Sequence, residues 1–218
     1  MNSVQSNRVY IIHWVLFCFV IAGITGFYYR LAIIHSLPFN FSLINVRHAH
    51  SHLMFFGWAS LFPLYLISTF SEFKGSATTL AKWSLKIILL LTLLTYPSFL
   101  MWGYKPVEIG NASLPISAIL SGFVMIGWYI FIISYFKNEN NESITPKSKW
   151  FEGALIALFL SSLGAWGVGV SGIMEVESLF IGKALTHSFL AVFTEGWILL
   201  FLLGLLTHVL KISDSEFI

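Results

Sequence analysis

The chain has 218 residues, of which 57% are hydrophobic and only 10% are charged, whereas a soluble domain averages roughly 25% charged residues. Its net charge of +2 is small and its charges are scattered, which argues against a nucleic-acid-binding surface. The single cysteine, Cys18, excludes a disulfide or a cysteine metal cluster within one chain. The composition therefore indicates a membrane protein whose metal chemistry rests on His, Glu, Asp or Met.

Six apolar runs follow one another along the chain, and each is near the roughly 20 residues that a helix needs to cross a bilayer. Because lipid offers no water to backbone groups, such runs without alternating polarity predict helices. The expected fold is all-α, a single transmembrane domain over residues 1–218 with six helices in one bundle. The spans are expected at residues 9–29, 49–70, 87–104, 109–136, 153–174 and 184–210.

The reactive side chains are distributed unevenly over these elements. The first span opens with His13, and the second begins with His48, His50 and His52 in the stretch RHAHSHLMFFGW. The third and fourth spans carry no histidine, and glycines in the fifth are expected to permit close helix packing. The sixth span holds His187, His208 and Glu195, the only carboxylate well inside a span.

The lysines and arginines predict the orientation, because cytoplasmic loops carry more of them than outer loops do. We expect the chain to cross the inner (plasma) membrane several times, with both termini in the cytoplasm. The His48–His52 cluster is expected to face the periplasm or exterior. The side with the termini carries Arg8, Lys74, Lys82, Lys86, Lys137, Lys147, Lys149 and Lys211, and the other side carries Arg30, Arg47, Lys105 and Lys183.

Helical geometry separates the three clustered histidines. At about 100° per residue, His48 and His52 lie about 40° apart and share a face, whereas His50 lies about 200° from His52. The spacing therefore predicts a helix that presents ligands on two sides. Ionisable residues at membrane depth are costly and indicate function.

The histidines of the sixth span are expected to complement those of the first two. His187 enters at the depth of the triplet, so a ligand held between the second and sixth helices is geometrically feasible. Glu195 lies about 12 Å deeper and is interpreted as a proton acceptor or relay. His13 and His208 share the cytoplasmic side, where they either oppose each other as bis-histidine heme ligands or bind water and headgroups.

Residues 50–57, HSHLMFFG, followed by WASLFPLYLI, resemble a ligand helix of the heme-copper oxidase catalytic subunit, particularly in its nitric oxide reductase branch. They are also similar to short oxidase-subunit-I-like membrane proteins. In the large enzymes one histidine of the pair ligates a low-spin heme and the other a high-spin heme. The resemblance implies these roles for His50 and His52.

The stretch THSFLAVFTEGWILL in the sixth span is similar to a second metal-binding segment of that family. Two departures are visible. Ala191 occupies the place of the family's glutamate, so that Glu195 comes one turn later, and the adjacent His-His pair of the family's metal site is absent from the chain. Six helices are also half the family's usual twelve.

Three functions are compatible with these residues. The first is a b-type heme protein that transfers electrons or binds O₂ or NO, an oxidoreductase if it turns over a substrate, with heme ligands among His50, His52, His187, His13 and His208. The second is a non-heme enzyme that holds Zn, Fe or Cu with His48, His50, His52 and His187. The third is a non-catalytic sensor, assembly or transport subunit. The expected partners are the lipid bilayer, a second copy or a larger respiratory complex, and an electron donor, without nucleic acid.

Overall fold

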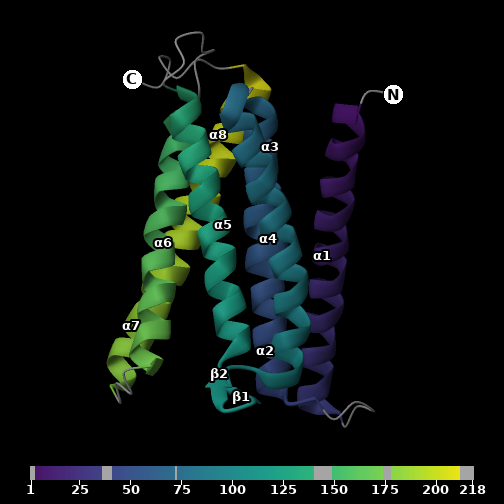
Figure 1. Cartoon of the computed structure of the whole chain (residues 1–218), viewed down its shortest axis with the longest axis vertical. Coiled ribbons are helices and arrows are strands. Elements are labelled where there is room, and N and C mark those ends of the chain that lie inside the picture. The colour runs from purple at the N-terminus through teal and green to yellow at the C-terminus, as the bar shows by residue number, and fades with distance from the viewer. Residues whose placement is uncertain (1–2, 36–40, 72, 140–148, 174–177, 212–218) are drawn as a thin grey trace. The chain divides into compact units, whose positions relative to one another are not determined.

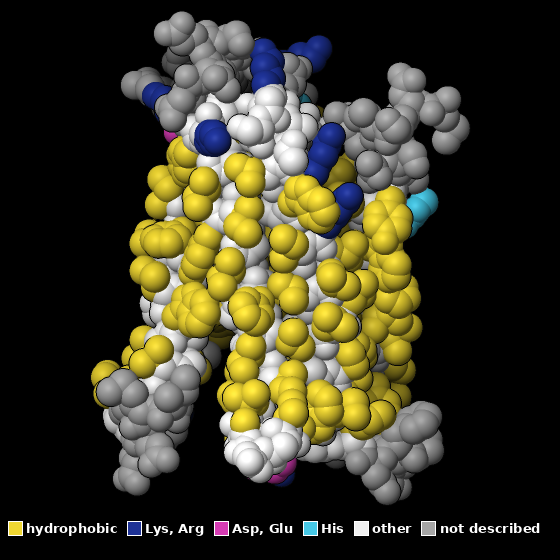
Figure 2. Space-filling view, viewed as in Figure 1, with side chains coloured by type: hydrophobic (Ala, Val, Ile, Leu, Met, Phe, Trp, Pro, Cys, Tyr) yellow, Lys and Arg dark blue, Asp and Glu magenta, His cyan; other side chains and the backbone are white. Residues whose placement is uncertain are grey.

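In the part of the chain that the structure describes, six long helices carry the apolar runs of the sequence (Figure 1). The computed structural model describes the chain except for residues 1–2, 36–40, 72, 140–148, 174–177 and 212–218. The six helices are long and apolar enough to cross a membrane, which confirms the predicted all-α class. Hydrophobic side chains cover the flanks of the helices that are visible in Figure 2. The chain is therefore described as a multi-pass membrane protein.

Two of the spans contain a segment of π-helix, so that each consists of three consecutive elements. The second span runs through α2, η1 and α3, and the sixth runs through α7, η2 and α8. The elements are α1 (Ser3–Ile34), α2 (Leu43–His52), η1 (Leu53–Ser60), α3 (Leu61–Phe70), α4 (Gly75–Trp102), β1 (Val107–Ile109), β2 (Ala112–Leu114), α5 (Ile116–Glu139), α6 (Lys149–Ile173), α7 (Leu179–Ala191), η2 (Val192–Ile198) and α8 (Leu199–Leu210).

Several expected boundaries differ from the observed ones, most of all the starts of the third and fourth spans. Residues 107–114 form a two-stranded antiparallel hairpin that pairs Val107 with Leu114, so the fourth span begins at Ile116 and not at residue 109. The third span begins at Gly75 and not at residue 87. Its first turns carry Lys82 and Lys86, which a search for uninterrupted apolar runs excludes although lysine is a good helix former.

The contacts divide the chain into two compact units, which are described separately. The first unit contains Met1–Thr69 and Thr78–Phe131, and the second contains Phe70–Ala77 and Ile132–Ile218.

In the first unit, α1 packs along α2 and η1 through small side chains. A Cβ on Gly57 of η1 would lie 2.8 Å from Cβ of Cys18 on α1, so only glycine permits this approach. Cys18 is fully buried together with Ala22 and Leu53. Close contact of small residues is how transmembrane helices gain van der Waals packing without a hydrophobic driving force. Polar links to α4 and α5 add to it, such as the 3.1 Å hydrogen bond that Trp128 Nε1 donates to Ser60.

In the second unit, α6 packs along α7, η2 and α8 in a similar manner. A Cβ on Gly196 of η2 would lie 2.9 Å from Cβ of Ala157 on α6, and one on Gly204 would lie 2.6 Å from the ring of Phe151. Phe151 is buried and stacks on Phe201. Asn138 secures the loop before α4, because its Oδ1 accepts a 2.9 Å hydrogen bond from the backbone N–H of Lys74.

The sequences of the hairpin α1–α3 and the hairpin α6–α8 align with a constant offset in residue number. The same number of residues separates Gly57 from Gly196, Cys18 from Ala157, and Leu53 from Val192. Leu53 and Val192 are the first residues of η1 and η2. Residues 48–62, HAHSHLMFFGWASLF, and 187–201, HSFLAVFTEGWILLF, then share His, Gly-Trp and Leu-Phe at the same positions. The two hairpins are therefore counterparts in sequence, in their π-helical segments and in the glycine contact that packs them.

Candidate functional site

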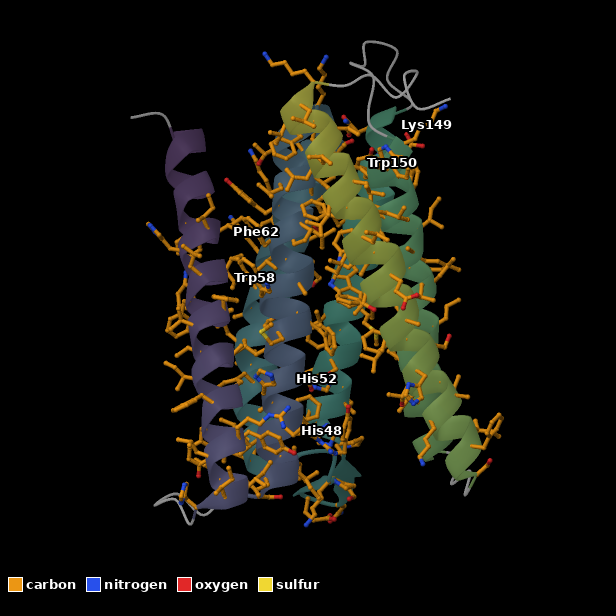
Figure 3. All side chains as sticks on the ribbon, turned by 180° about the vertical axis from the view of Figure 1, so that it is seen from behind. His48, His52, Trp58, Phe62, Lys149 and Trp150 are labelled. Atoms are coloured by element: carbon orange, nitrogen blue, oxygen red, sulfur yellow. The ribbon has the colours of Figure 1, made fainter. Side chains whose placement is uncertain are left out.

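The three clustered histidines lie on α2 of the first unit, on two different faces. His50 contacts α1, where its Nδ1 lies 2.8 Å from the carbonyl oxygen of Ala22. His48 and His52 contact Phe99 near the end of α4 and Tyr104, which lies two residues beyond that end. Figure 3 shows His48 and His52 one above the other on the same helix. The two-sided arrangement predicted from the spacing of the histidines is confirmed.

The ring of His50 is held in one orientation by α1. Because Ala22 offers a carbonyl oxygen, Nδ1 of His50 must carry the proton and donate it, which leaves the lone pair on Nε2. The ring lies so close to α1 that a Cβ on Gly26 would be 2.7 Å from Cε1 of His50. Metal-ligating histidines typically show this arrangement, in which a backbone carbonyl fixes the tautomer and frees the other nitrogen. His50 is therefore oriented as a ligand would be.

The ring of His52 is held in a different way. Its Nδ1 donates to the carbonyl oxygen of His48 at 2.9 Å, one turn earlier on the same helix. The ring stacks on Phe99 with a centroid distance of 3.9 Å and meets the edge of Phe56 at 5.4 Å. Its Nε2 therefore carries the lone pair, and Tyr104 Oη lies 3.4 Å from it.

Tyr104 is positioned by the way in which α4 ends. Gly103 adopts φ +60°, a left-handed conformation that favours glycine, and its N–H donates to the carbonyl of Phe99 at 3.0 Å. Asn45 of α2 donates from Nδ2 to the carbonyls of Leu100 and Met101, each at 3.4 Å. These bonds join the start of α2 to the end of α4 and set Tyr104 beside His48 and His52.

The surroundings of Tyr104 keep its phenol neutral. Desolvation raises the pKa of Tyr104 to about 12, so the hydroxyl is protonated at neutral pH and donates toward Nε2 of His52. At 3.4 Å this hydrogen bond is longer than the usual range for a hydroxyl donor. The pair is therefore a weak contact between two groups that are both able to bind a metal ion.

The remaining candidate residues lie apart from this cluster along the chain. His13 lies on α1 in the first unit and is exposed. In the second unit, His187 on α7 and Glu195 in η2 are exposed, and His208 on α8 stacks on Phe70 with a centroid distance of 4.1 Å. Among its described residues, the second unit therefore has two imidazoles and one carboxylate on one span.

Three residues of the site were not expected from the sequence. Ala22 and Gly26 act through a backbone carbonyl and through the absence of a side chain, and neither property has a signature in a single sequence. Tyr104 lies at the end of a span, where the usual role of a tyrosine is that of an interfacial anchor. The neighbouring Gly103, which lies inside the span expected at residues 87–104, was the available signal that the helix ends there.

No three His, Cys, Asp or Glu side chains of the described residues form a group that would hold a metal ion. Comparisons of the chain with protein-family models, with curated proteins and with solved structures found no match. The functional argument therefore depends on the geometry around His48, His50, His52 and Tyr104.

Proposed function

We propose that the chain is an integral-membrane, b-type heme-binding redox protein in which His50 would hold the heme iron. The observation that carries the proposal is the 2.8 Å contact between His50 Nδ1 and the carbonyl of Ala22, which leaves Nε2 as the ligating atom. The donor chemistry suits the group, because a neutral imidazole is the common proximal ligand of heme iron. The resemblance of residues 50–57 to a ligand helix of heme-copper oxidases points to the same residue.

The chain's own residues would have defined tasks. His50 would bind the heme iron through Nε2. The carbonyl of Ala22 would fix the tautomer of the His50 ring, and Gly26 would leave room for that ring. A bound heme supplies one-electron transfer or the binding of a small gas such as O₂ or NO. Glu195 is assigned the role of proton acceptor or relay, because a carboxylate within a span is costly unless it is used.

The same proposal includes an orientation. We place the chain in the inner (plasma) membrane, with the His-bearing end of α2 facing outward and the lysine-rich side in the cytoplasm. The support is the excess of Lys and Arg on the side of the termini.

Optical spectroscopy tests the proposal directly. Protein purified after expression with ample heme is expected to show a Soret band and to change its spectrum on reduction with dithionite. His50→Phe is expected to lose most of the bound heme, because it removes Nε2 and installs the residue that the counterpart helix carries at Phe189. His35→Gln is the matched control, since His35 is an exposed histidine in the first unit.

Two results would contradict the proposal. One is the absence of a Soret band in folded wild-type protein. The other is an unchanged heme content in folded His50→Phe protein, because the iron would then be held by another residue.

A further inference from the structure

The face of α2 opposite His50 gathers two imidazoles and a phenol. His48 and His52 are one helical turn apart, and the ring of Tyr104 meets the ring of His48 edge-on at a centroid distance of 4.8 Å. The hydroxyl of Tyr104 lies 3.4 Å from Nε2 of His52. Figure 3 labels His48 and His52, which lie one above the other on α2. Nothing in the proposed role of His50 uses this second group.

We propose that His48, His52 and Tyr104 form a tetrahedral binding site for one divalent transition-metal ion such as Zn²⁺, with Cu²⁺ as a spectroscopic probe of the same ligands. Two imidazoles at i and i+4 are a chelating pair on a helix, and the imidazole nitrogens suit Cu and Zn. The phenol completes a set of three ligands. This site lies beyond the proposed heme function, because it occupies the other face of α2.

The distance between two of the ligands matches such a site. A metal ion sits about 2.0–2.1 Å from each nitrogen or oxygen ligand. In a tetrahedral arrangement, two ligand atoms are then separated by roughly 3.3–3.4 Å. His52 Nε2 and Tyr104 Oη are 3.4 Å apart, which is long for a hydroxyl hydrogen bond and suitable for two atoms that share a metal ion.

The surrounding residues keep two of the three ligands, His52 and Tyr104, in place. The ring of His52 is fixed by its bond to the carbonyl of His48 and by stacking on Phe99. Phe99 also meets Tyr104 at a centroid distance of 5.0 Å. Gly103 and Asn45 fix the turn that carries Tyr104. Both the tautomer of His52 and the position of the phenol are therefore set before an ion arrives.

Proton balance is straightforward at this position. On binding, the Tyr104 hydroxyl releases its proton to water and the phenolate oxygen forms a bond to the metal, with no change in oxidation state. Tyr104 comes two residues after Trp102, the last residue of the third span, so it lies outside the membrane-spanning segments. Because protons compete with the ion for these ligands, the affinity is expected to rise with pH.

Copper titration of the full chain in detergent or nanodiscs tests the site. Electron paramagnetic resonance is expected to show one Cu²⁺ per chain, with splitting from two imidazole nitrogens and a phenolate-to-copper absorption band. Tyr104→Phe is expected to abolish that band and to weaken binding at least roughly tenfold. His48→Gln is expected to leave splitting from one nitrogen.

Matched variants separate this site from adventitious copper and from the heme. Tyr10→Phe on α1 and His35→Gln directly after α1 change exposed residues and are expected to leave both the band and the splitting unchanged. Copper that binds equally to wild type, Tyr104→Phe and His48→Gln would overturn the proposal, and so would the absence of stoichiometric binding to the folded wild type. Cu²⁺ binds most tightly of the first-row divalent ions. A site that fails to bind Cu²⁺ is therefore not expected to bind the others. A failed Soret experiment would contradict the heme proposal and leave this result unaffected.

Discussion

The hairpins α1–α3 and α6–α8 have the same framework and different chemistry. In both, a glycine of a π-helical segment packs on a small residue of the preceding long helix, Gly57 on Cys18 and Gly196 on Ala157. His50 of the first hairpin corresponds in sequence to Phe189 of the second, and Gly26 corresponds to Ala165. The framework is thus set by packing residues that the two share, and the chemistry by a few positions at which they differ.

The difference at these positions is coordinated. In the first hairpin the imidazole of His50 fits because Gly26 has no side chain, and its Nδ1 donates to Ala22. In the second hairpin, the apolar ring of Phe189 takes the place of the imidazole. The Cβ of Phe189 lies close to Gly164, so that a Cβ added to Gly164 would be 3.1 Å from it. The hairpin is a scaffold that accepts either an oriented ligand or an apolar ring at this place.

The largest expected effect is on the framework itself. Gly57→Val and Gly196→Val each force a side chain into a helix contact that is already close, at 2.8 Å and 2.9 Å from Cβ to Cβ. Each is expected to reduce the free energy of unfolding by about 1–3 kcal/mol. Thermal unfolding in detergent measures this loss. Gly23→Val is the control, because a Cβ there meets nothing within 4 Å.

The comparison would be broken if only one of the two glycine variants were destabilising. The hairpins would then resemble each other in sequence without depending on the same contact. Similar losses of stability in the two variants would support a shared dependence of both hairpins on the glycine contact.

A smaller effect is expected from exchanging the residues that differ. Gly26→Ala places a methyl group 2.7 Å from Cε1 of His50, so the ring must shift away from the carbonyl of Ala22. We expect heme affinity to fall roughly 10- to 100-fold, the range for residues that orient a metal ligand. Heme titration followed at the Soret band measures the change. The reverse exchange in the second hairpin, Ala165→Gly, is expected to leave the affinity unchanged, and a loss there equal to that of Gly26→Ala would refute the positional role of Gly26.

The smallest effect concerns Tyr104, which lies in the first unit beside His48 and His52. Its pKa is raised to about 12 from 10.0. The folded state therefore holds the phenolic proton more tightly than the unfolded state, so stability is lost as pH rises from about 10 to 12. The residue keeps 48% of its surface exposed, so solvent reduces the loss to a fraction of about 1.4 kcal/mol per unit of pKa shift.

Unfolding measured between neutral pH and about pH 11 is expected to show a shallower decline in Tyr104→Phe than in the wild type. Tyr10→Phe is the matched comparison, and a decline that is equally shallow in that variant would show that Tyr104 is not the responsible group.

The sequence was sufficient for the fold class and for the two faces of α2. Both follow from periodicity, because a run of apolar residues predicts a helix and angular spacing separates His50 from His48 and His52. The sequence was not sufficient for the partners of these rings. Ala22 participates through a carbonyl that every residue carries, and Tyr104 reaches His52 only because Gly103 turns the chain. The start of the third span was misjudged because lysines interrupt its apolar run while its helix continues.

The π-helical segment η1 also determines where the histidines point. A π-helical segment is an insertion in an otherwise α-helical ladder, so α2 is rotated about its own axis relative to α3. Trp128 holds Ser60 at the α3 end of η1, and the packing of Gly57 on Cys18 holds its middle. Shortening the segment by one residue would turn α2 by about 100°, and neither His50 nor His52 would then face its present neighbour. The direction in which both imidazoles point is thus determined by the residues from Leu53 to Ser60, which follow the histidines in the sequence.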